Sequence, residues 1–267
     1  VVIMNGKNQT IITKIINNHI LLVTLNRPEF ANAFNTLMSK ELTTLIEDLS
    51  LSSDNIRSII LTGAGERAFC AGGDLKERNG MSDEDWGKQH LIYERMIRAI
   101  IDCPIPIIGA INGAAYGGGC EIAAALDFIF VSDNAKFSLP ELQLGIIPGA
   151  GGTQNLSRAV GERRAKELIL TGKVFSAQEA VKWNLANDVF PKKDLLDKAI
   201  EIAELISSKA PIAVKQAKQS IHKGLQMSLS DGLSFEIEAY NRTIPTKDRR
   251  EGVSAFNEKR RPKFEGK

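Results

Sequence analysis

The sequence has few cysteines, and they form no recognisable pairs. Cys70, Cys103 and Cys120 are odd in number and scattered through 267 residues. Such sparse usage favours buried free thiols in a reducing, intracellular environment over a disulfide scaffold. Because Cys120 has no evident histidine base, a cysteine nucleophile is not indicated.

Histidine is equally scarce. His19, His90 and His222 stand alone, with no His-x-x-x-His spacing and no Cys-x-x-Cys pair beside them. Zinc sites need such clustered ligands. The sequence therefore predicts no metal site, and we expect each histidine to be an ordinary surface or core residue.

An excess of charge and a long apolar run are also missing. The 34 basic and 32 acidic residues leave a net charge of +2, which gives no nucleic-acid or membrane signature. No apolar run approaches the roughly 20 residues that a membrane helix requires. Val1–Met4 show neither a signal peptide nor an Arg-rich transit pattern. We therefore expect a bacterial-type cytoplasmic protein, with no nucleic acid and no membrane among its partners.

The first part of the chain alternates strand-like and helix-like segments, which is typical of βαβ units around a largely parallel sheet. Apolar residues at helical spacing predict helices over 36–49 and within 83–101. The expected strands are the β-branched and aliphatic runs Thr10–Ile16, His19–Asn26, Ser58–Leu61, Ile107–Ile111 and Phe128–Val131. An α/β core over residues 1–190 follows.

The strand pattern stops near residue 190. Four segments of helical composition follow, over 195–208, 211–223, 230–240 and 247–259. We therefore predict a separate C-terminal helical region over residues 191–267.

Glycine gathers in segments where regular packing does not call for it. Glycine beside a helix start lets backbone N–H groups approach a ligand, and two such groups from different loops are suited to hold a developing oxyanion. For any one loop alone, a tight turn or a close helix–strand contact is the better explanation. The segments are Ala68–Lys76, Asn112–Glu121 and Ile147–Gln154, and Leu139–Glu141, which has no glycine, stands out with them.

Two familiar nucleotide-binding loops are excluded. Gly149–Thr153 is not a Walker loop, because it lacks Gly-Lys-Ser/Thr. Gly117–Gly119 lacks the Rossmann spacing and precedes Glu121, which would repel a pyrophosphate.

In this order the segments resemble the crotonase, or enoyl-CoA hydratase/isomerase, superfamily over nearly the whole chain. The matching blocks are Leu25–Pro28, Phe69–Lys76, Gly117–Glu121, Pro140–Gln154 and Asp248–Phe256. The resemblance implies a spiral of ββα units whose C-terminal helices mediate assembly into a homotrimer, often a dimer of trimers. It also implies an acyl-CoA thioester substrate and no separate cofactor, since coenzyme A is part of the substrate.

Family members hold the thioester oxygen with two backbone N–H groups. The resemblance assigns these to Ala71 and Gly118, and it places Ala71, Gly72, Gly73 and Asp74 along the bound thioester and part of coenzyme A.

Glu121 and Glu141 point to water addition as the reaction. Hydratases of the family carry a glutamate directly after the glycine-rich turn and another after a proline about twenty residues later, whereas many isomerases keep one. The resemblance implies that Glu121 activates a water as base, that Glu141 delivers the proton, and that Gly149 contacts the water. Residues twenty positions apart are too distant to meet on one helix face, so only tertiary folding can bring the two glutamates together. Two ordinary surface or helix-start glutamates are the alternative.

The edge of the acyl pocket is expected near residues 75–82, with Met81 and Trp86 as apolar walls. The Asp-Leu-Lys-Glu-Arg run is similar to the methylglutaconyl-CoA hydratase branch. Lys76 and Arg78 are candidates for contacts to CoA phosphates or to a substrate carboxylate, although a solvated charge cluster explains them equally well.

At the other end, Phe256 and Lys259 match positions that contact the nucleotide of a neighbouring subunit in the family. Helix-end packing and solvation are nearly as good an explanation. Glu29 departs from the basic residue that often follows Asn-Arg-Pro in relatives, which puts one phosphate contact in doubt.

Some relatives on the methylglutaconyl-CoA hydratase branch bind RNA through a lysine-rich helix near the N-terminus. Here the helix has Lys40 against Glu41, Glu47 and Asp48, so we expect no comparable RNA binding. The alternatives to the hydratase are an isomerase or carbon–carbon lyase with the same oxyanion hole, and a non-catalytic trimeric binding protein. The length and branching of the acyl chain depend on a few pocket side chains, which the sequence alone does not identify.

Overall fold

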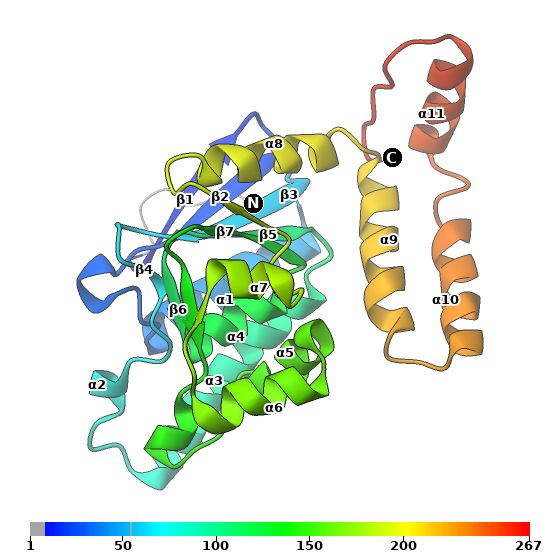
Figure 1. Cartoon of the computed structure of the whole chain (residues 1–267). Helices are drawn as coiled ribbons and strands as arrows, with labels where there is room; N and C mark the ends of the chain where they lie inside the picture. The colour runs from blue at the N-terminus through cyan, green and yellow to red at the C-terminus, as the bar shows by residue number, and fades with distance from the viewer. Residues whose placement is uncertain (1–8, 54) are drawn as a thin grey trace.

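The computed structural model describes residues 9–53 and 55–267, so the expectation drawn from Val1–Met4 lies outside the described residues. The chain folds around a six-stranded sheet (Figure 1). Its strands, in spatial order, are β1 (Ile11–Ile16), β2 (Ile20–Leu25), β3 (Ser58–Gly63), β5 (Ile107–Ile111), β7 (Phe128–Ser132) and β10 (Asp188–Phe190). The five expected strands are confirmed, each within two residues at either end.

Only the first strand pair is antiparallel; the other four pairings in this sheet are parallel. Asn17 and Asn18, in the β1–β2 turn, adopt left-handed backbone conformations with φ of 49° and 63°. Asparagine tolerates this conformation better than most residues. The largely parallel sheet that the alternating pattern predicts is confirmed.

A smaller sheet lies beside the first. Its order is β4 (Ala68–Cys70), β6 (Ala114–Tyr116), β8 (Lys136–Ser138) and β9 (Phe175–Ser176). In sequence, β3 and β4, β5 and β6, and β7 and β8 each place one strand in the large sheet and the next in the small sheet. Helices follow each pair, so the chain winds through repeated strand–strand–helix units.

The two faces of the large sheet bury different helices. Leu21, Ile59 and Leu61 belong to a core cluster that includes α1 (Thr36–Leu51) and α3 (Asp83–Asp102). Ile20 and Ile60, one position away, belong to the cluster with α8 (Leu195–Ser207), which lies across the other face in Figure 1. Successive strand residues point to opposite faces, and since both faces are covered, β3 is buried along its whole length.

The remaining helices complete the fold. They are η1 (Pro28–Phe30), α2 (Leu75–Arg78), α4 (Gly118–Ala125), η2 (Glu141–Leu144), α5 (Gly152–Val160), α6 (Glu162–Thr171), α7 (Ala177–Lys182), α9 (Pro211–Gly224), α10 (Leu229–Asn241) and α11 (Lys247–Asn257). No helix within the described ranges is long and apolar enough to cross a membrane.

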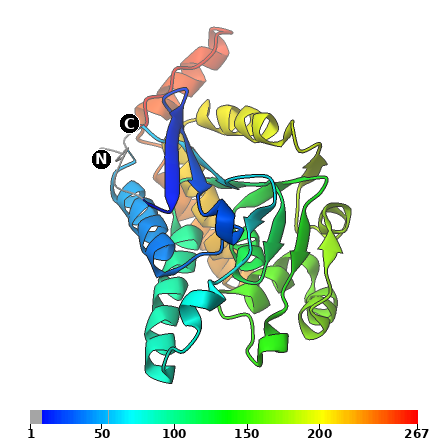
Figure 2. The ribbon, with the colours of Figure 1, turned by 90° about the vertical axis from the view of Figure 1, so that its left-hand side faces the viewer.

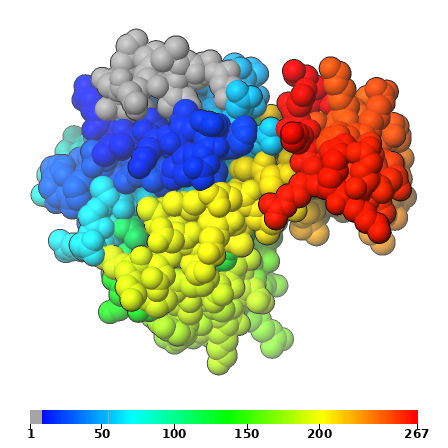
Figure 3. Space-filling view, turned by 90° about the horizontal axis from the view of Figure 1, so that it is seen from above, coloured from blue at the N-terminus to red at the C-terminus, as the bar shows by residue number. Residues whose placement is uncertain are grey.

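The last three helices stand to one side of the core, with α9 and α10 side by side (Figures 1 and 2). From above, this C-terminal part bulges away from the body of the molecule (Figure 3). Lys218 of α9 ties it to the core, since its Nζ lies 2.6 Å from Asp127 Oδ2 and donates to the Ile105 carbonyl. The four predicted C-terminal helices are confirmed, and α8 packs on the sheet rather than with the other three.

The small sheet meets α4 through a backbone contact that leaves no room for a side chain. A Cβ on Gly119 would lie 2.0 Å from the Cys70 carbonyl oxygen and 2.7 Å from its carbon. Both partners are buried backbone atoms, so neither can move aside by a change of side-chain rotamer. This contact sets how closely the start of α4 approaches the end of β4.

Gly119→Ala is therefore expected to lower the free energy of unfolding by about 3 kcal/mol or more. Gly87→Ala is the matched control, because Gly87 lies inside α3 with no atom within 4 Å of the added Cβ; it should be neutral or stabilising by about 0.5–1 kcal/mol. Urea unfolding measures both. Equal midpoints for the two variants would contradict the close contact.

Candidate active site

The three glycine-rich segments and Leu139–Glu141 converge on one cavity of about 570 Å³, called here the glutamate cavity. They reach it where β4, β6 and β8 end, and the carboxyl ends of parallel strands are the usual place for a ligand in α/β folds. α2, α3 and the segment after η2 complete the walls. The lining residues are Phe34, Ala71, Gly72, Gly73, Leu75, Arg78, Trp86, Gly87, His90, Tyr93, Gly117, Gly118, Glu121, Pro140, Glu141, Leu144, Ile146, Ile147, Gly149 and Ala150.

Glu121 lies in the first turn of α4 and is only 3% exposed. Its Oε1 accepts hydrogen bonds from the backbone N–H groups of Ala150 and Gly152, both at 2.8 Å. Burial raises the pKa of Glu121 to about 7, and the neighbouring Glu141 adds to the rise, although the two N–H donors oppose it. The carboxyl is thus poised to gain or lose a proton near neutral pH.

Glu141 begins η2, directly after Pro140, and is 8% exposed. Burial raises the pKa of this carboxyl too. Its Oε2 is buried and has no hydrogen-bond partner among the described residues. Folding therefore brings together two desolvated carboxyl groups from distant parts of the chain, as the sequence requires if they are to act on one substrate.

Gly72 brings the first two loops into contact. Its φ is +97°, and a Cβ there would lie 2.8 Å from the Tyr116 carbonyl oxygen and 3.0 Å from the Gly118 nitrogen. The N–H of Gly118 has no acceptor within residues 9–53 and 55–267. The N–H of Ala71, in contrast, donates to the Ala31 carbonyl at 3.0 Å. Of the two predicted oxyanion donors, only Gly118 is unengaged.

Gly149 has a second uncommitted N–H at the Glu121 end of the cavity. No acceptor is assigned to it in the part of the chain that the structure describes. The next residue, Ala150, holds Glu121. The structure therefore places Gly149 beside the carboxyl with which it was predicted to share a water.

Asp74 has a different setting from the predicted substrate contact. Its Oδ2 pairs with Arg27 at 2.9 Å, and its Oδ1 caps α2 by accepting from the N–H groups of Lys76 and Glu77. Burial favours the neutral acid, but these partners outweigh burial and hold the pKa of Asp74 below its ordinary value. Asp74 is outside the cavity lining. Its carboxylate orients the Ala71–Gly73 loop and α2.

Lys76 is exposed, and its Nζ lies 5.6 Å from the centre of the Phe30 ring. It does not line the glutamate cavity. Phe256 lies in the last turn of α11 and is 84% exposed, and Lys259 follows two residues after the helix ends. Neither residue lines the glutamate cavity of its own chain, and α11 stands apart from α2 and α3, which border that cavity (Figure 1). Their predicted contacts with a neighbour's nucleotide stay predictions.

Of the two residues predicted to form apolar walls of the acyl pocket, one lines the cavity. Trp86 lines the glutamate cavity and Met81 does not. Arg78 stacks on Trp86, with Cζ 4.1 Å from the ring centre, and lies 4.9 Å from the ring centre of Tyr93. Its Nε donates to Gln89 at 2.8 Å. The guanidinium is thus held rigidly at the cavity wall.

His90 also lies at the glutamate cavity, a position that the sequence did not predict for it. It was expected to be an ordinary surface or core histidine, but it lines the cavity with both glutamates. Its ring packs on Gly149, where a Cβ would lie 2.6 Å from Cε1. The signal was the helical spacing of Trp86, His90 and Tyr93, which places the three side chains along one face of α3.

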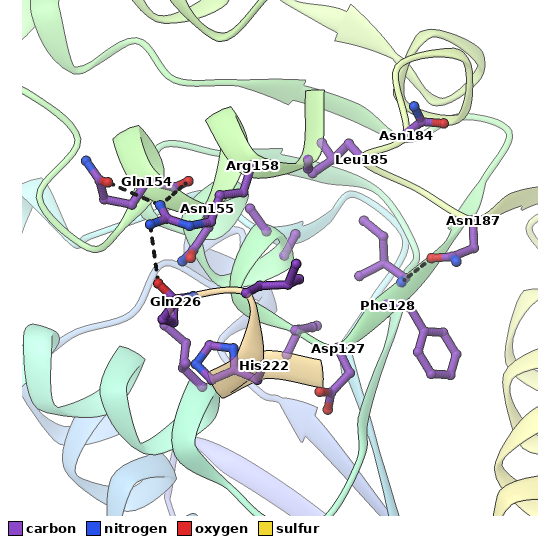
Figure 4. A pocket seen from close by; sticks show the side chains of 17 residues that line it. Asp127, Phe128, Gln154, Asn155, Arg158, Asn184, Leu185, Asn187, His222 and Gln226 are labelled. Atoms are coloured by element: carbon purple, nitrogen blue, oxygen red, sulfur yellow. Dashed lines mark hydrogen bonds between the residues drawn. The ribbon is translucent and has the colours of Figure 1, made fainter. Parts of the chain in front are cut away.

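A second large cavity lies between α5 and the end of α9 (Figure 4). Arg158, Asn155, His222 and Gln226 line it, and Arg158 donates to the carbonyl and the side-chain oxygen of Gln154. Neither glutamate reaches this cavity. It has polar groups but no carboxyl pair, so the glutamate cavity is the candidate active site.

The raised pKa of Glu121 predicts how stability changes with pH. Since the folded state favours the neutral acid, its contribution to stability is complete below pH 4.5 and is lost as pH rises towards 7. Glu121→Gln should therefore match the wild type near pH 4 and exceed its free energy of unfolding at pH 8, by on the order of 2 kcal/mol. Urea unfolding at the two pH values measures this. The exposed Glu162→Gln serves as control, and a pH-independent difference would contradict burial as the cause.

Comparison with known proteins agrees with this geometry. Residues 15–267 match the family model described as enoyl-CoA hydratase/isomerase. The chain is 42% identical over 247 residues to the short-chain-enoyl-CoA hydratase of Clostridium acetobutylicum, covering 92% of this chain and 94% of that protein. It is 39% identical over 249 residues to the mitochondrial enoyl-CoA hydratase of Pongo abelii, covering 93% and 84%.

A solved structure extends the match to three dimensions. The crystal structure of enoyl-CoA hydratase from Bacillus anthracis superposes with a TM-score of 0.95 at 46% identity, and the match covers 97% of this chain and all of that one. The predicted spiral of ββα units is thereby confirmed. The chain belongs to the enoyl-CoA hydratase/isomerase, or crotonase, family.

Proposed function

We propose that this chain is an enoyl-CoA hydratase that adds water across the 2,3 double bond of a 2-enoyl-CoA, with Glu121 and Glu141 as the acid and base. The observation that carries the proposal is a set of polar groups around one cavity that have no hydrogen-bond partner within the described part of the chain. Among the described residues these are the Gly118 N–H, the Gly149 N–H and Glu141 Oε2. The two N–H donors are suited to bind an oxyanion and a water, and the carboxyl oxygen is suited to transfer a proton.

In this mechanism the substrate carbonyl oxygen accepts a hydrogen bond from the Gly118 N–H. Negative charge develops on that oxygen as the enolate forms, and a preorganised donor stabilises it there. Ala71 is the second donor. Because its N–H already donates to Ala31, it shares its hydrogen with the substrate oxygen or leaves the Ala31 carbonyl when substrate binds.

The water lies between the two carboxyl groups and the Gly149 N–H. Glu121 takes a proton from the water as its oxygen bonds to C3, and Glu141 gives a proton to C2. The product gains one hydrogen and one hydroxyl, and the proton on Glu121 returns to Glu141 through exchange, which closes the cycle. The charge repulsion between the two carboxyl groups, which adds to the rise in the Glu121 pKa, couples their titrations.

Coenzyme A enters as part of the substrate, and no separate cofactor takes part. Gly72 and Gly73 lie along the thioester, where the absence of side chains permits close approach. Lys76, at the exposed edge of α2, contacts a CoA phosphate. Phe256 and Lys259 contact the nucleotide bound to a neighbouring subunit.

A homotrimer, alone or paired as a hexamer, is the assembly we propose. Its support is a stripe of apolar side chains that a single chain leaves exposed on α9, α10 and the loop between them. Ile221, Leu225, Leu229, Leu233 and Ile237 are between 53% and 81% exposed. Contiguous apolar surface of this kind marks an interface.

A cytoplasmic location is also proposed. Cys70, Cys103 and Cys120 are all buried free thiols, and burial raises their pKa values. Unpaired cysteines of this kind fit a reducing compartment.

The carboxyl pair predicts the outcome of two conservative substitutions. Glu121→Gln and Glu141→Gln should each lower kcat for crotonyl-CoA hydration by about 10²-fold or more, because an amide neither takes nor gives the proton. Loss of the enoyl-thioester ultraviolet absorbance measures the rate. Glu162→Gln, an exposed carboxyl on α6, is the control and should keep full activity.

If one of the two variants keeps wild-type activity, a single acid/base is sufficient and an isomerase becomes the better assignment. A wild type that is inactive with crotonyl-CoA, longer enoyl-CoAs and 3-methylglutaconyl-CoA would remove the hydratase proposal altogether.

Arg78 favours a finer assignment to the methylglutaconyl-CoA branch. Its terminal nitrogens have no hydrogen-bond or ion-pair partner among the described residues, while Trp86 and Tyr93 fix its plane. The surrounding wall is largely apolar, with Leu75, Leu144 and others. A fixed guanidinium with free Nη atoms is suited to bind a carboxylate at the far end of the acyl group.

Accordingly, Arg78→Lys should reduce kcat/KM for 3-methylglutaconyl-CoA at least about 10-fold relative to crotonyl-CoA, since lysine keeps the charge but loses the fork and the stacking. The ratio of the two kcat/KM values is the readout, so a general loss of activity cancels. Arg95→Lys, an exposed arginine of α3 paired with Glu47, is the control. An unchanged ratio would exclude Arg78 as a carboxylate ligand.

A further inference from the structure

His90 is a polar group of the glutamate cavity that the mechanism above does not use. It lies on the cavity-facing side of α3, one turn after Trp86 and one turn before Tyr93. The side chain is half-buried. Neither ring nitrogen has a hydrogen-bond partner among the residues that the structure describes, whereas His19 Nδ1 lies 2.9 Å from the Asn55 carbonyl oxygen.

The ring is confined to the end of the cavity where Glu121 is held. A Cβ on Gly149 would lie 2.6 Å from His90 Cε1 and 3.0 Å from Nε2, but 3.7 Å from Nδ1. The Cε1–Nε2 edge therefore faces the Gly149 backbone. Only glycine at position 149 leaves room for the ring in this place, since any other residue would collide with it.

The backbone next to this contact is the one that orients the base. Ala150, directly after Gly149, donates its N–H to Glu121 Oε1 at 2.8 Å, and Gly152 does the same. The imidazole, the free Gly149 N–H and Glu121 thus border the same small volume. Much of the remaining wall is formed by Leu144, Ile146 and Ile147, which shortly precede Gly149 in the sequence. Their side chains cannot form hydrogen bonds.

We propose that His90 is a specificity-determining residue that hydrogen-bonds the oxygen added at C3, and so recognises the 3-hydroxyacyl product. This inference rests on the proposed hydration at the glutamate pair. A neutral imidazole has one donor and one acceptor nitrogen, and a hydroxyl both donates and accepts. The ring therefore matches the hydroxyl group without a change in charge.

The alternative is that the ring only packs against Gly149. The two roles respond differently to two substitutions at position 90. Phenylalanine keeps an aromatic ring for packing but has no hydrogen-bonding atom. Glutamine loses the ring and keeps both a donor and an acceptor.

The test measures binding of two ligands that differ only in the hydroxyl. Kd values for butyryl-CoA and for both enantiomers of 3-hydroxybutyryl-CoA are obtained by isothermal titration calorimetry, with His, Gln or Phe at position 90. All three proteins carry Glu141→Gln, which slows turnover of the hydroxyacyl ligand during the titration. A neutral hydrogen bond corresponds to about a fivefold change in Kd.

In the expected result, His90→Phe weakens binding of one 3-hydroxybutyryl-CoA enantiomer about fivefold and leaves butyryl-CoA within twofold. His90→Gln keeps most of the preference for the hydroxylated ligand. Equal changes for both ligands, or no change for either, would overturn the proposal and leave His90 a packing residue.

Failure of the underlying function is seen separately. If Glu141 is not part of the hydration machinery, the Glu141→Gln proteins form the enoyl thioester from 3-hydroxybutyryl-CoA at the wild-type rate. Its ultraviolet absorbance then rises during the titration, whatever residue occupies position 90.

Discussion

Two hydrogen bonds from Ala150 and Gly152 to one oxygen of Glu121 join the parts of the chain on which the site depends. They connect the first turn of α4 to the start of α5, about thirty residues later. Without them, a carboxyl only 3% exposed would be buried with no compensation, which is costly. With them, one oxygen is fixed and the other is left for chemistry.

Glycine makes this arrangement sterically possible. Gly152 approaches so closely that a Cβ would lie 2.8 Å from Glu121 Oε1, and Gly119 presses on the Cys70 carbonyl. The same loops keep backbone donors at Gly118 and Gly149 without acceptors among the described residues. Unpartnered groups and a raised Glu121 pKa lower stability, and such departures from good packing rules are characteristic of functional sites.

Different walls of the glutamate cavity supply different kinds of functional group. The carboxyl groups and backbone donors come from the segments that follow β4, β6 and β8, from α4 and η2, and from the loop before α5. Arg78 and His90 come from α2 and α3. Residues of this second group differ in chemistry from the apolar side chains around them, so they are positioned to select among acyl groups while leaving the water-adding machinery intact.

Periodicity and composition determined much of the architecture. β-branched runs such as Ile107–Ile111 and helical spacing over 36–49 predicted elements that the structure confirms, because these patterns report which faces must be buried. The resemblance in motif order identified Glu121 and Glu141, although their spacing alone is uninformative. Both kinds of signal are local, or depend on order along the chain.

Only the tertiary structure decided which side chains face the cavity. Asp74 lies within a predicted substrate segment, yet Arg27 and the start of α2 occupy its carboxylate. His90 looked like an ordinary histidine, yet it packs on Gly149, nearly sixty residues away. The physical reason is that a helix face reads as apolar or polar from the sequence, whereas what that face meets depends on contacts between segments far apart in the chain.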